Sequence, residues 1–283
     1  MIIAVASGKG GTGKTFIAVN LAAVLEQPVQ LLDCDVEEPN AHLFFNENWY
    51  NESIVTMPIP LINADNCDTC NDCVSFCRFN ALASAGNSVL LFPELCHSCG
   101  GCVLLCHRQA ITETAQRIGN IRTLYKDSLV LKSGCLDVGS SMTSALINKL
   151  RQQAAPDMIT LLDAPPGTAC QTVTTLRNTD FVILVTDSTA FGLHDLTLAV
   201  DTTRELKIPF GVVINRAITG DDRIQQYCAQ ESIPVLLEIP DDRRIAEVYS
   251  RGQLIVKVLP EYQTHFLRLW TAIAGLINTG ENT

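Results

Sequence analysis

Two runs of cysteine in the middle of the sequence share the spacing C-x2-C-x2-C-x3-C. They consist of Cys67, Cys70, Cys73 and Cys77, and of Cys96, Cys99, Cys102 and Cys106. Three thiolates on one tight loop can bind three irons of a 4Fe–4S cube, and a more distant fourth cysteine completes the ligand set. Four cysteines can also hold zinc, but structural zinc ligands usually come as separated C-x2-C pairs. The spacing therefore predicts two iron–sulfur sites.

A glycine-rich stretch near the start of the sequence is a second group of residues that could do chemistry. Residues 8–15 fit the phosphate-binding pattern G-x-x-x-x-G-K-S/T. Its glycines let several backbone N–H groups point at one polyphosphate, its last lysine adds a positive charge, and its final hydroxyl can bind Mg²⁺. The candidate nucleotide-binding residues are Gly8, Lys9, Gly10, Gly11, Thr12, Gly13, Lys14 and Thr15, the last as a Mg²⁺ ligand. A turn without a ligand is the alternative.

Apolar patterns predict the elements that must position these groups. Residues 2–6 form an apolar strand-like run before the loop, and residues 16–25 have the apolar spacing of a helix. Three further strand-like runs end in polar side chains, which are Asp35, Asp163 and Asn215. Ligands of doubly wound sheets bind at the carboxyl ends of the strands. We therefore expect an α/β fold with a doubly wound, mostly parallel sheet and a nucleotide at that edge.

Lys9 distinguishes the loop from the general pattern. Residues 9–15, Lys-Gly-Gly-Thr-Gly-Lys-Thr, resemble the deviant Walker A loop of a class of P-loop ATPases that includes MinD, ParA, the Mrp-type iron–sulfur carriers and the nitrogenase iron protein. In that class the additional lysine contacts the nucleotide of a second subunit. The resemblance therefore implies that the ligand is ATP and that the protein is an ATP-dependent homodimer. A solvated loop lysine is the alternative for Lys9.

The resemblance extends to the strand ends. Residues 33–40 are similar to the first switch region of this class, which implies that Asp35 lies near the attacking water. Asp163, followed by Ala-Pro-Pro-Gly-Thr, resembles the Walker B and second switch segments. This implies that Asp163 holds Mg²⁺ through a water, that the Gly167 N–H contacts the γ-phosphate, and that Asn215 reads the adenine edge. The catalytic residues so implied are Lys9, Lys14, Asp35 and Asp163.

The cysteine runs resemble a two-cluster bacterial ferredoxin, in which the fourth cysteine of each run binds the other cluster. This resemblance implies one cluster on Cys67, Cys70, Cys73 and Cys106 and a second on Cys96, Cys99, Cys102 and Cys77. Arg78 and His107 stand where that family usually has proline. We expect an inserted α+β ferredoxin-like domain at residues 59–126, between two parts of the ATPase domain at residues 1–58 and 127–283.

Four cysteines lie outside the runs, namely Cys34, Cys135, Cys170 and Cys228. Taken singly, each is expected to be a small buried hydrophobe. The offsets of Cys135 and Cys170 from Asp163 resemble those of the two cysteines with which nitrogenase iron protein subunits share a cluster. That resemblance implies a third 4Fe–4S cluster that bridges two subunits. The Mrp-type carriers have a C-x-x-C pair nearer the C-terminus, and this chain has none there.

Charge and hydropathy disfavour several classes of function. The net charge is −10 and the sequence has no basic run, which argues against a nucleic-acid partner. No apolar run is long enough to cross a membrane, and residues 262–277 read as a core-packed helix rather than a basic membrane anchor. The sequence enters its first strand without a charged leader, so its twelve cysteines are expected to bind metal rather than form disulfides. We expect a cytoplasmic protein.

Three functions compete at this point. The first is ATP-dependent assembly or delivery of an iron–sulfur or other metal cofactor to an apo-acceptor protein, which the Mrp resemblance suggests. The second is ATP-gated electron transfer to a redox partner through the clusters. The third is a positioning ATPase like MinD, which the lack of a basic membrane anchor disfavours. Transfer of labelled iron to an acceptor would distinguish the first function from the second.

Overall fold

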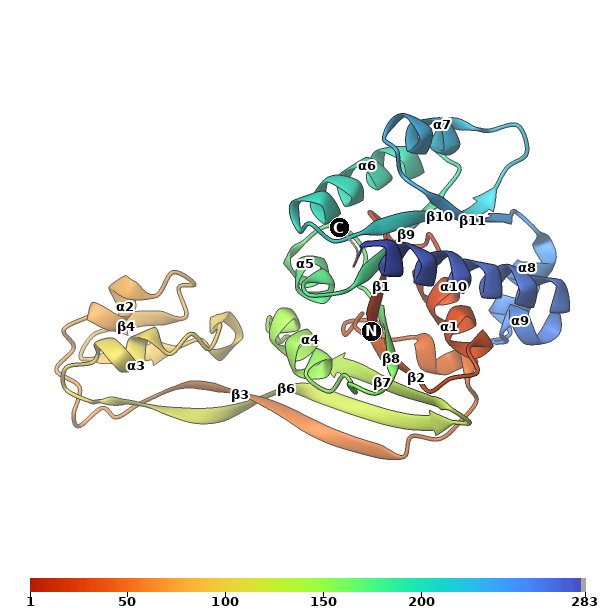
Figure 1. The fold of residues 1–283 in the computed structure, drawn as a ribbon. Coiled ribbons are helices and arrows are strands. Elements are labelled where there is room, and N and C mark those ends of the chain that lie inside the picture. Colours follow the sequence, from red (N-terminus) through yellow and green to blue (C-terminus); the bar gives the residue numbers. More distant parts are fainter. Residues whose placement is uncertain (281–283) are drawn as a thin grey trace.

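A nine-stranded sheet forms the centre of the computed structural model, which describes residues 1–280 (Figure 1). The strand order is β11-β10-β9-β1-β8-β2-β7-β6-β3. The strands are β1 (Ile2–Ala6), β2 (Val29–Asp33), β3 (Asn51–Ile62), β6 (Ile111–Lys126), β7 (Leu129–Leu136), β8 (Ile159–Asp163), β9 (Phe181–Asp187), β10 (Phe210–Ala217) and β11 (Val235–Pro240). Strands β11 to β7 in this order run parallel, whereas β6 and β3 are antiparallel. The expected mostly parallel α/β sheet is therefore confirmed.

Helices cover both faces of the parallel part, as Figure 1 shows. One face packs against α1 (Lys14–Val24), α8 (Arg243–Ser250), α9 (Ile255–Val258) and α10 (Pro260–Gly280). The other packs against α4 (Thr143–Arg151), α5 (Cys170–Leu176), α6 (Ala190–Glu205) and α7 (Arg223–Gln230). Because both faces are covered, the central strands are apolar on both sides, which explains their continuous apolar runs.

The predicted last helix is confirmed as part of the core. Helix α10 buries Phe266, Leu269 and Ile273 completely against the sheet and α1. Among residues 1–280, no helix combines the length and the apolar character that a membrane crossing requires.

Strands β3 and β6 form a long two-stranded ribbon that leaves the sheet. Their register runs from Asn51 opposite Thr123 to Ile62 opposite Ile111. Residues 119–126 of β6 also pair with β7, so the ribbon is anchored in the nine-stranded sheet. The outer half of β6, residues 112–117, is exposed and has no strand-like apolar alternation in its sequence.

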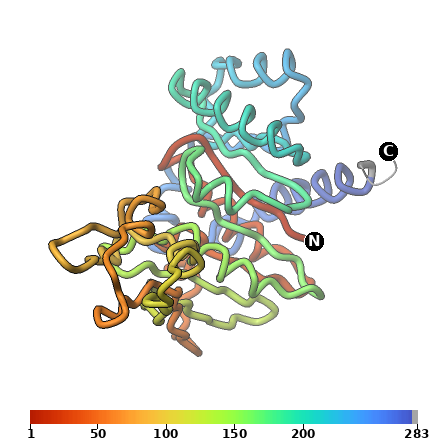
Figure 2. The backbone as a smooth tube through the Cα atoms, turned by 90° about the vertical axis from the view of Figure 1, so that its left-hand side faces the viewer, coloured from red at the N-terminus to blue at the C-terminus, as the bar shows by residue number. Residues whose placement is uncertain are grey.

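A small cysteine-rich lobe, residues 63–110, sits at the end of the ribbon. It contains α2 (Asp72–Phe76), the antiparallel strands β4 (Leu82–Ala85) and β5 (Ser88–Leu91), the short 3-10 helix η2 (Pro93–Leu95) and α3 (Gly101–Leu105). In Figure 2 the lobe, coloured orange to yellow, lies apart from the blue helix α10. The two cysteine runs have the same backbone, since the left-handed conformation recurs at the equivalent pairs Thr69 and Ser98, Asn71 and Gly100, and Asn80 and Gln109.

The lobe also folds back against the part of the chain that forms the nine-stranded sheet. The Ser141 hydroxyl donates a hydrogen bond to the Glu94 carbonyl, and the Ser98 hydroxyl lies 3.7 Å from the Met142 sulfur. Met142 and Ser141 directly precede α4, which Figure 1 places closest to the lobe. The ribbon is therefore not the only link between the lobe and the sheet.

Candidate functional site

The glycine-rich loop joins β1 to α1 at the carboxyl edge of the sheet. Gly13 precedes α1 with φ +101°, and a β-carbon there would overlap the Asn215 side-chain nitrogen. A β-carbon on Gly8 would overlap the Asp195 carbonyl on α6. These two positions accept only glycine, and they bring the loop N–H groups to the start of a helix, where anions bind favourably.

Lys14, Asp35 and Asp163 face one another beside this loop. Burial lowers the pKa of Lys14, which is 7% exposed, and the carboxylates of Asp163 and Asp35 partly offset that effect. Burial raises the pKa of Asp163 to about 7, although the neighbouring Thr15 hydroxyl and Lys14 act against it. Burial likewise raises the pKa of Asp35. The structure thus brings together the predicted lysine and the two predicted acids.

The Asp163 carboxylate provides a direct test of fit for Mg²⁺. Both its oxygens are buried without a hydrogen-bond partner, and the Thr15 hydroxyl lies near enough to lower the pKa of the carboxyl group. Buried unpartnered carboxylate oxygens next to a threonine hydroxyl are the hard oxygen donors that Mg²⁺ requires. Thr15 and Asp163 therefore suit the metal that the sequence analysis assigned to them.

Asp33 is a site residue that sequence reasoning missed. It is fully buried, and its Oδ2 accepts hydrogen bonds from the backbone N–H groups of Asn40 at 2.9 Å and Ala41 at 3.0 Å. Burial and the nearby Asp163 carboxylate raise its pKa well above the usual range. Asp33 thereby fixes the loop that carries Asp35. Its position at the end of β2 was the only signal in the sequence.

Gly167 lies in the left-handed region, with φ +86°, directly after the Pro-Pro pair. Its N–H, which was expected to contact the γ-phosphate, donates to the Ser7 carbonyl at 3.1 Å. A phosphate would have to compete with that bond. Gly167 is therefore next to the loop but would need to move before it could bind a nucleotide.

A cavity of about 280 Å³ opens beside the loop. Its lining residues are Gly11, Gly13, Phe16, Asn215, Arg216, Pro240, Asp241, Asp242, Ile245, Ala246 and Tyr249. The Asn215 amide donates to the Thr12 carbonyl at 2.8 Å, and the Arg216 guanidinium donates to the Gly11 carbonyl. The rings of Phe16 and Tyr249 meet edge to face at 5.9 Å. Aromatic walls with a few placed polar groups suit a purine base.

Lys9 forms contacts that the sequence did not reveal. Its Nζ lies 3.1 Å from Asp187 Oδ2, 3.5 Å from the Thr189 hydroxyl and 4.0 Å from Asp195 Oδ2. Burial alone would raise the pKa of Asp187, but hydrogen bonds from Thr189 and Lys9 hold it below its usual value. Lys9 therefore points to acids of its own chain.

The eight cysteines of the two runs line two separate cavities in the lobe. One is lined by Cys67, Cys70, Cys73 and Cys106, and the other by Cys77, Cys96, Cys99 and Cys102. Each cavity thus contains three cysteines of one run and the fourth of the other. Backbone N–H groups also donate to sulfur, from Ala110 to Cys106 at 3.3 Å and from Ser98 to Cys96 at 3.4 Å. Four thiols with N–H···S bonds form a donor set that suits a 4Fe–4S cluster.

The other four cysteines have different environments, and none of the twelve forms a disulfide within residues 1–280. Cys34 and Cys228 are buried, as expected. For Cys170 the expectation of a buried hydrophobe is wrong, because the residue begins α5 at the surface and is exposed. Cys135 is half-buried in β7 opposite Asn120.

A continuous set of contacts connects the two candidate sites. The N–H of Leu136 donates to the Val36 carbonyl at 2.8 Å, and the Thr143 hydroxyl donates to Glu37 Oε1 at 3.0 Å. Between these two contacts, residues 137–142 form the loop that contacts the lobe. Through Met142 this loop reaches Ser98, whose N–H donates to Cys96 Sγ.

Comparison with known proteins is consistent with this geometry. Residues 3–255 match the family model described as the CobQ/CobB/MinD/ParA nucleotide binding domain. An uncharacterized protein of Methanocaldococcus jannaschii is 30% identical over 91% of this chain and 92% of its own length. The iron-sulfur cluster carrier protein of Aquifex aeolicus is 26% identical over 99% of this chain and 69% of its own length. The structure of MinD from Pyrococcus horikoshii with Mg-ADP has a TM-score of 0.59 and 18% identity, over 98% of each chain, and shares the fold.

Proposed function

Because the chain belongs to the CobQ/CobB/MinD/ParA family of nucleotide-binding P-loop ATPases, we propose that it hydrolyses ATP as a homodimer and couples this cycle to two 4Fe–4S clusters in the lobe. The coupled process is the assembly or delivery of an iron–sulfur or metal cofactor to an apo-acceptor protein. Several relatives, including those of Aquifex aeolicus and Pyrococcus furiosus, are named iron-sulfur cluster carrier proteins, which supports delivery as the purpose.

The observation that carries this proposal is the series of contacts that runs from the Asp35 loop through residues 136–143 to the lobe. Asp35 sits beside Lys14, and the next two residues, Val36 and Glu37, bond to Leu136 and Thr143. A movement of the Asp35 loop on nucleotide binding would therefore displace the loop at residues 137–142 through these two hydrogen bonds. Because this loop contacts Ser98 beside Cys96, the movement would reach one cysteine cavity directly.

The residues of the ATPase site have separate tasks in this account. Lys14 and the loop N–H groups bind the phosphates, while Thr15 and Asp163 hold Mg²⁺. Asp35 orients the attacking water, and Asn215 contacts adenine. Lys9 crosses to the partner subunit's nucleotide, which requires it to leave Asp187.

The lobe has the donors that two clusters need. Bound clusters would supply sites for electron storage or iron and sulfide for transfer, and the chain contributes the thiolates and the N–H···S bonds that hold them. Burial raises the pKa of Cys102 to about 11, so cluster binding at this cysteine must displace a thiol proton.

We also propose a third cluster, held by Cys135 and Cys170 of both subunits, which is independent of the two clusters in the lobe. Both thiols have solvent access and could meet those of a partner subunit. Counting iron per dimer in the Cys135→Ala, Cys170→Ala double variant tests it. Unchanged iron content would remove the bridging cluster and leave the rest of the proposal in place.

Transfer of labelled iron tests delivery against ATP-gated electron transfer. The chain is reconstituted anaerobically with labelled iron and mixed with an apo-ferredoxin as acceptor, with ATP, with ADP or without nucleotide. Delivery predicts that label appears in the acceptor and that ATP changes its rate, with no nucleotide effect in Lys14→Ala. If the label stays on the chain while a redox partner is reduced only with ATP, electron transfer is the function.

A further inference from the structure

The two cysteine cavities have the same cysteine geometry but different neighbours. The repeat aligns Asp68 with His97, Asp72 with Gly101, and His107 with Arg78. Around the cavity of Cys77, Cys96, Cys99 and Cys102, which we call the inner cavity, the His97 ring stacks on Phe79 at 3.8 Å, and Pro58, Pro60 and Phe76 complete the wall. This neighbourhood is mainly apolar.

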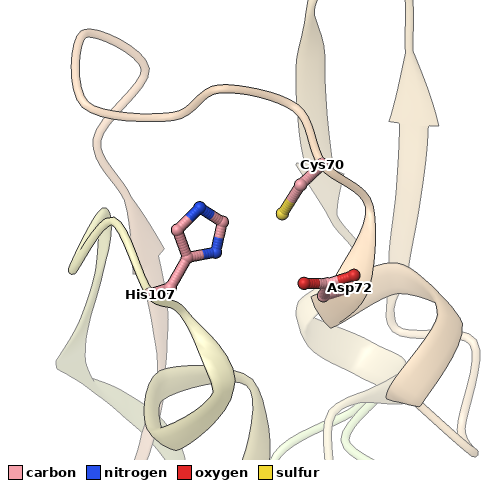
Figure 3. Close-up of side chains that lie close together, drawn as sticks. All are labelled: Cys70, Asp72 and His107. Atoms are coloured by element: carbon pink, nitrogen blue, oxygen red, sulfur yellow. The ribbon is translucent and has the colours of Figure 1, made fainter.

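The outer cavity, lined by Cys67, Cys70, Cys73 and Cys106, has polar neighbours instead. Asp68 Oδ2 lies 3.1 Å from His107 Nε2 and 3.8 Å from the Arg108 guanidinium. The potential ligand atoms of Cys70, Asp72 and His107 all lie within 4.8 Å of one another. All three residues are exposed, and Figure 3 shows their side chains converging on one space between α2 and the turn before β6.

We propose that Asp72 and His107 form an alternative ligand set for the iron bound by Cys70, and that the outer cavity is therefore the one from which a cluster is released. The inner cavity has Gly101 and Arg78 at the equivalent positions, neither of which can donate to iron. His97 and Glu113 also line it, but among the described residues their ligand atoms do not converge with Cys99 as those of Asp72 and His107 do with Cys70. The cluster of the inner cavity is accordingly the one that stays. This inference rests on the proposed function, because it assumes that the lobe holds clusters.

His107 is oriented for this role. A proton on Nε2 that is donated to Asp68 leaves the lone pair of Nδ1 free for a metal, which is the carboxylate–histidine–metal arrangement common in metal sites. Asp72 contributes a carboxylate oxygen from the first turn of α2. Together they surround the exposed cysteine of the outer cavity with one nitrogen and one oxygen donor.

The exchange changes no oxidation state. The Fe–S bond to Cys70 breaks, an Fe–N bond to His107 or an Fe–O bond to Asp72 forms, and the released thiolate takes a proton from water. Nitrogen and oxygen donors suit the iron of this site less well than thiolate does, so the exchanged state holds its cluster more weakly. An acceptor thiol can then replace the weaker ligand.

Matched cysteine variants test the proposal in the whole chain after anaerobic reconstitution. We expect Cys70→Ala to keep two four-iron clusters, because His107 or Asp72 occupies the vacated position. We expect Cys99→Ala, the equivalent change in the inner cavity, to lose about one iron and give the EPR signal of a three-iron cluster. In Cys70→Ala, nitrogen hyperfine coupling to the reduced cluster would identify His107.

A triple variant provides the control. Cys70→Ala combined with Asp72→Gly and His107→Arg gives the outer cavity the residues of the inner one at these two positions, and it should lose iron as Cys99→Ala does. Equal iron loss in Cys70→Ala and Cys99→Ala would overturn the inference. If instead wild-type protein takes up no clusters, the proposed function itself fails, so the two failures are distinguishable.

Discussion

The Lys9 ammonium lies 3.1 Å from Oδ2 of Asp187 in the same chain. The two residues are 178 positions apart, and they meet because β1 and β9 are neighbouring parallel strands whose carboxyl ends share one edge. The lysine that would reach the partner subunit's nucleotide is therefore engaged within its own subunit. In the proposed dimer, Lys9 of each subunit would have to leave Asp187 of its own chain.

Asp187→Asn should therefore favour the dimer. The proposed dimer breaks one such partly buried ion pair in each subunit, so removing both, at about 1 kcal/mol each, would lower the ATP-dependent dimer dissociation constant about thirtyfold. Analytical ultracentrifugation of both proteins in an Asp35→Ala background, which lacks the carboxylate proposed to orient the attacking water, measures this. Asp195→Asn, whose carboxylate is 4.0 Å away, is the control and should have a smaller effect. Unchanged or weaker dimerisation in Asp187→Asn would contradict the account.

Gly13→Ala should destabilise the chain by several kcal/mol and abolish ATP binding. The new methyl group would overlap Asn215 and occupy a left-handed backbone position. Gly10→Ala is the matched control, since the nearest atom to its β-carbon is Pro166 Cβ at 3.9 Å, and its stability should stay close to wild type. Thermal unfolding without nucleotide compares the two. If Gly13→Ala and Gly10→Ala lose the same stability, the close approach of Asn215 to Gly13 does not determine the effect.

Asp163 should make the metal-free chain less stable as pH rises. Its folded-state pKa of about 7 exceeds the usual aspartate value of 3.8, so the folded chain binds more protons between these values and stability falls from about pH 4 to pH 7. Asp163→Asn should reduce this loss of stability by a few kcal/mol. Part of the pH dependence should remain, because burial also raises the pKa of Asp33. Urea unfolding at several pH values measures the slope. If the dependence of stability on pH is the same in Asp163→Asn as in wild type, the pKa of Asp163 is not raised in the folded chain.

Asn215→Ala should weaken ATP binding about tenfold and reduce its preference over GTP. The substitution removes both the predicted adenine contact and the bond from the amide to the Thr12 carbonyl. Titration with fluorescent ATP and GTP analogues measures both affinities. Equal losses for the two nucleotides would assign Asn215 to holding the loop rather than to base recognition.

Thr143→Val should uncouple the two sites without stopping ATP turnover. The change preserves side-chain volume but removes the hydrogen bond to Glu37. ATP hydrolysis should stay close to wild type while the effect of ATP on labelled iron transfer decreases. If ATP still changes transfer as in wild type, this contact does not carry the coupling.

Residues with strong local patterns could be predicted from the sequence. The loop at residues 8–15, the apolar strands and the repeated cysteines each follow a short-range rule, and the structure has the predicted strand, helix and cysteine groupings there. The pairing of Lys9 with Asp187 could not be predicted, because it depends on which strands become neighbours. The same holds for the Ser98–Met142 contact, which depends on how the lobe folds back along its ribbon.

The EPR spectrum of the reduced, anaerobically reconstituted chain with and without Mg-ATP tests the central claim most directly. The account predicts the signals of two reduced 4Fe–4S clusters, and it predicts that ATP shifts them in wild type but not in Lys14→Ala. A chain that stays free of iron after reconstitution, or spectra that are identical with and without ATP, would contradict it.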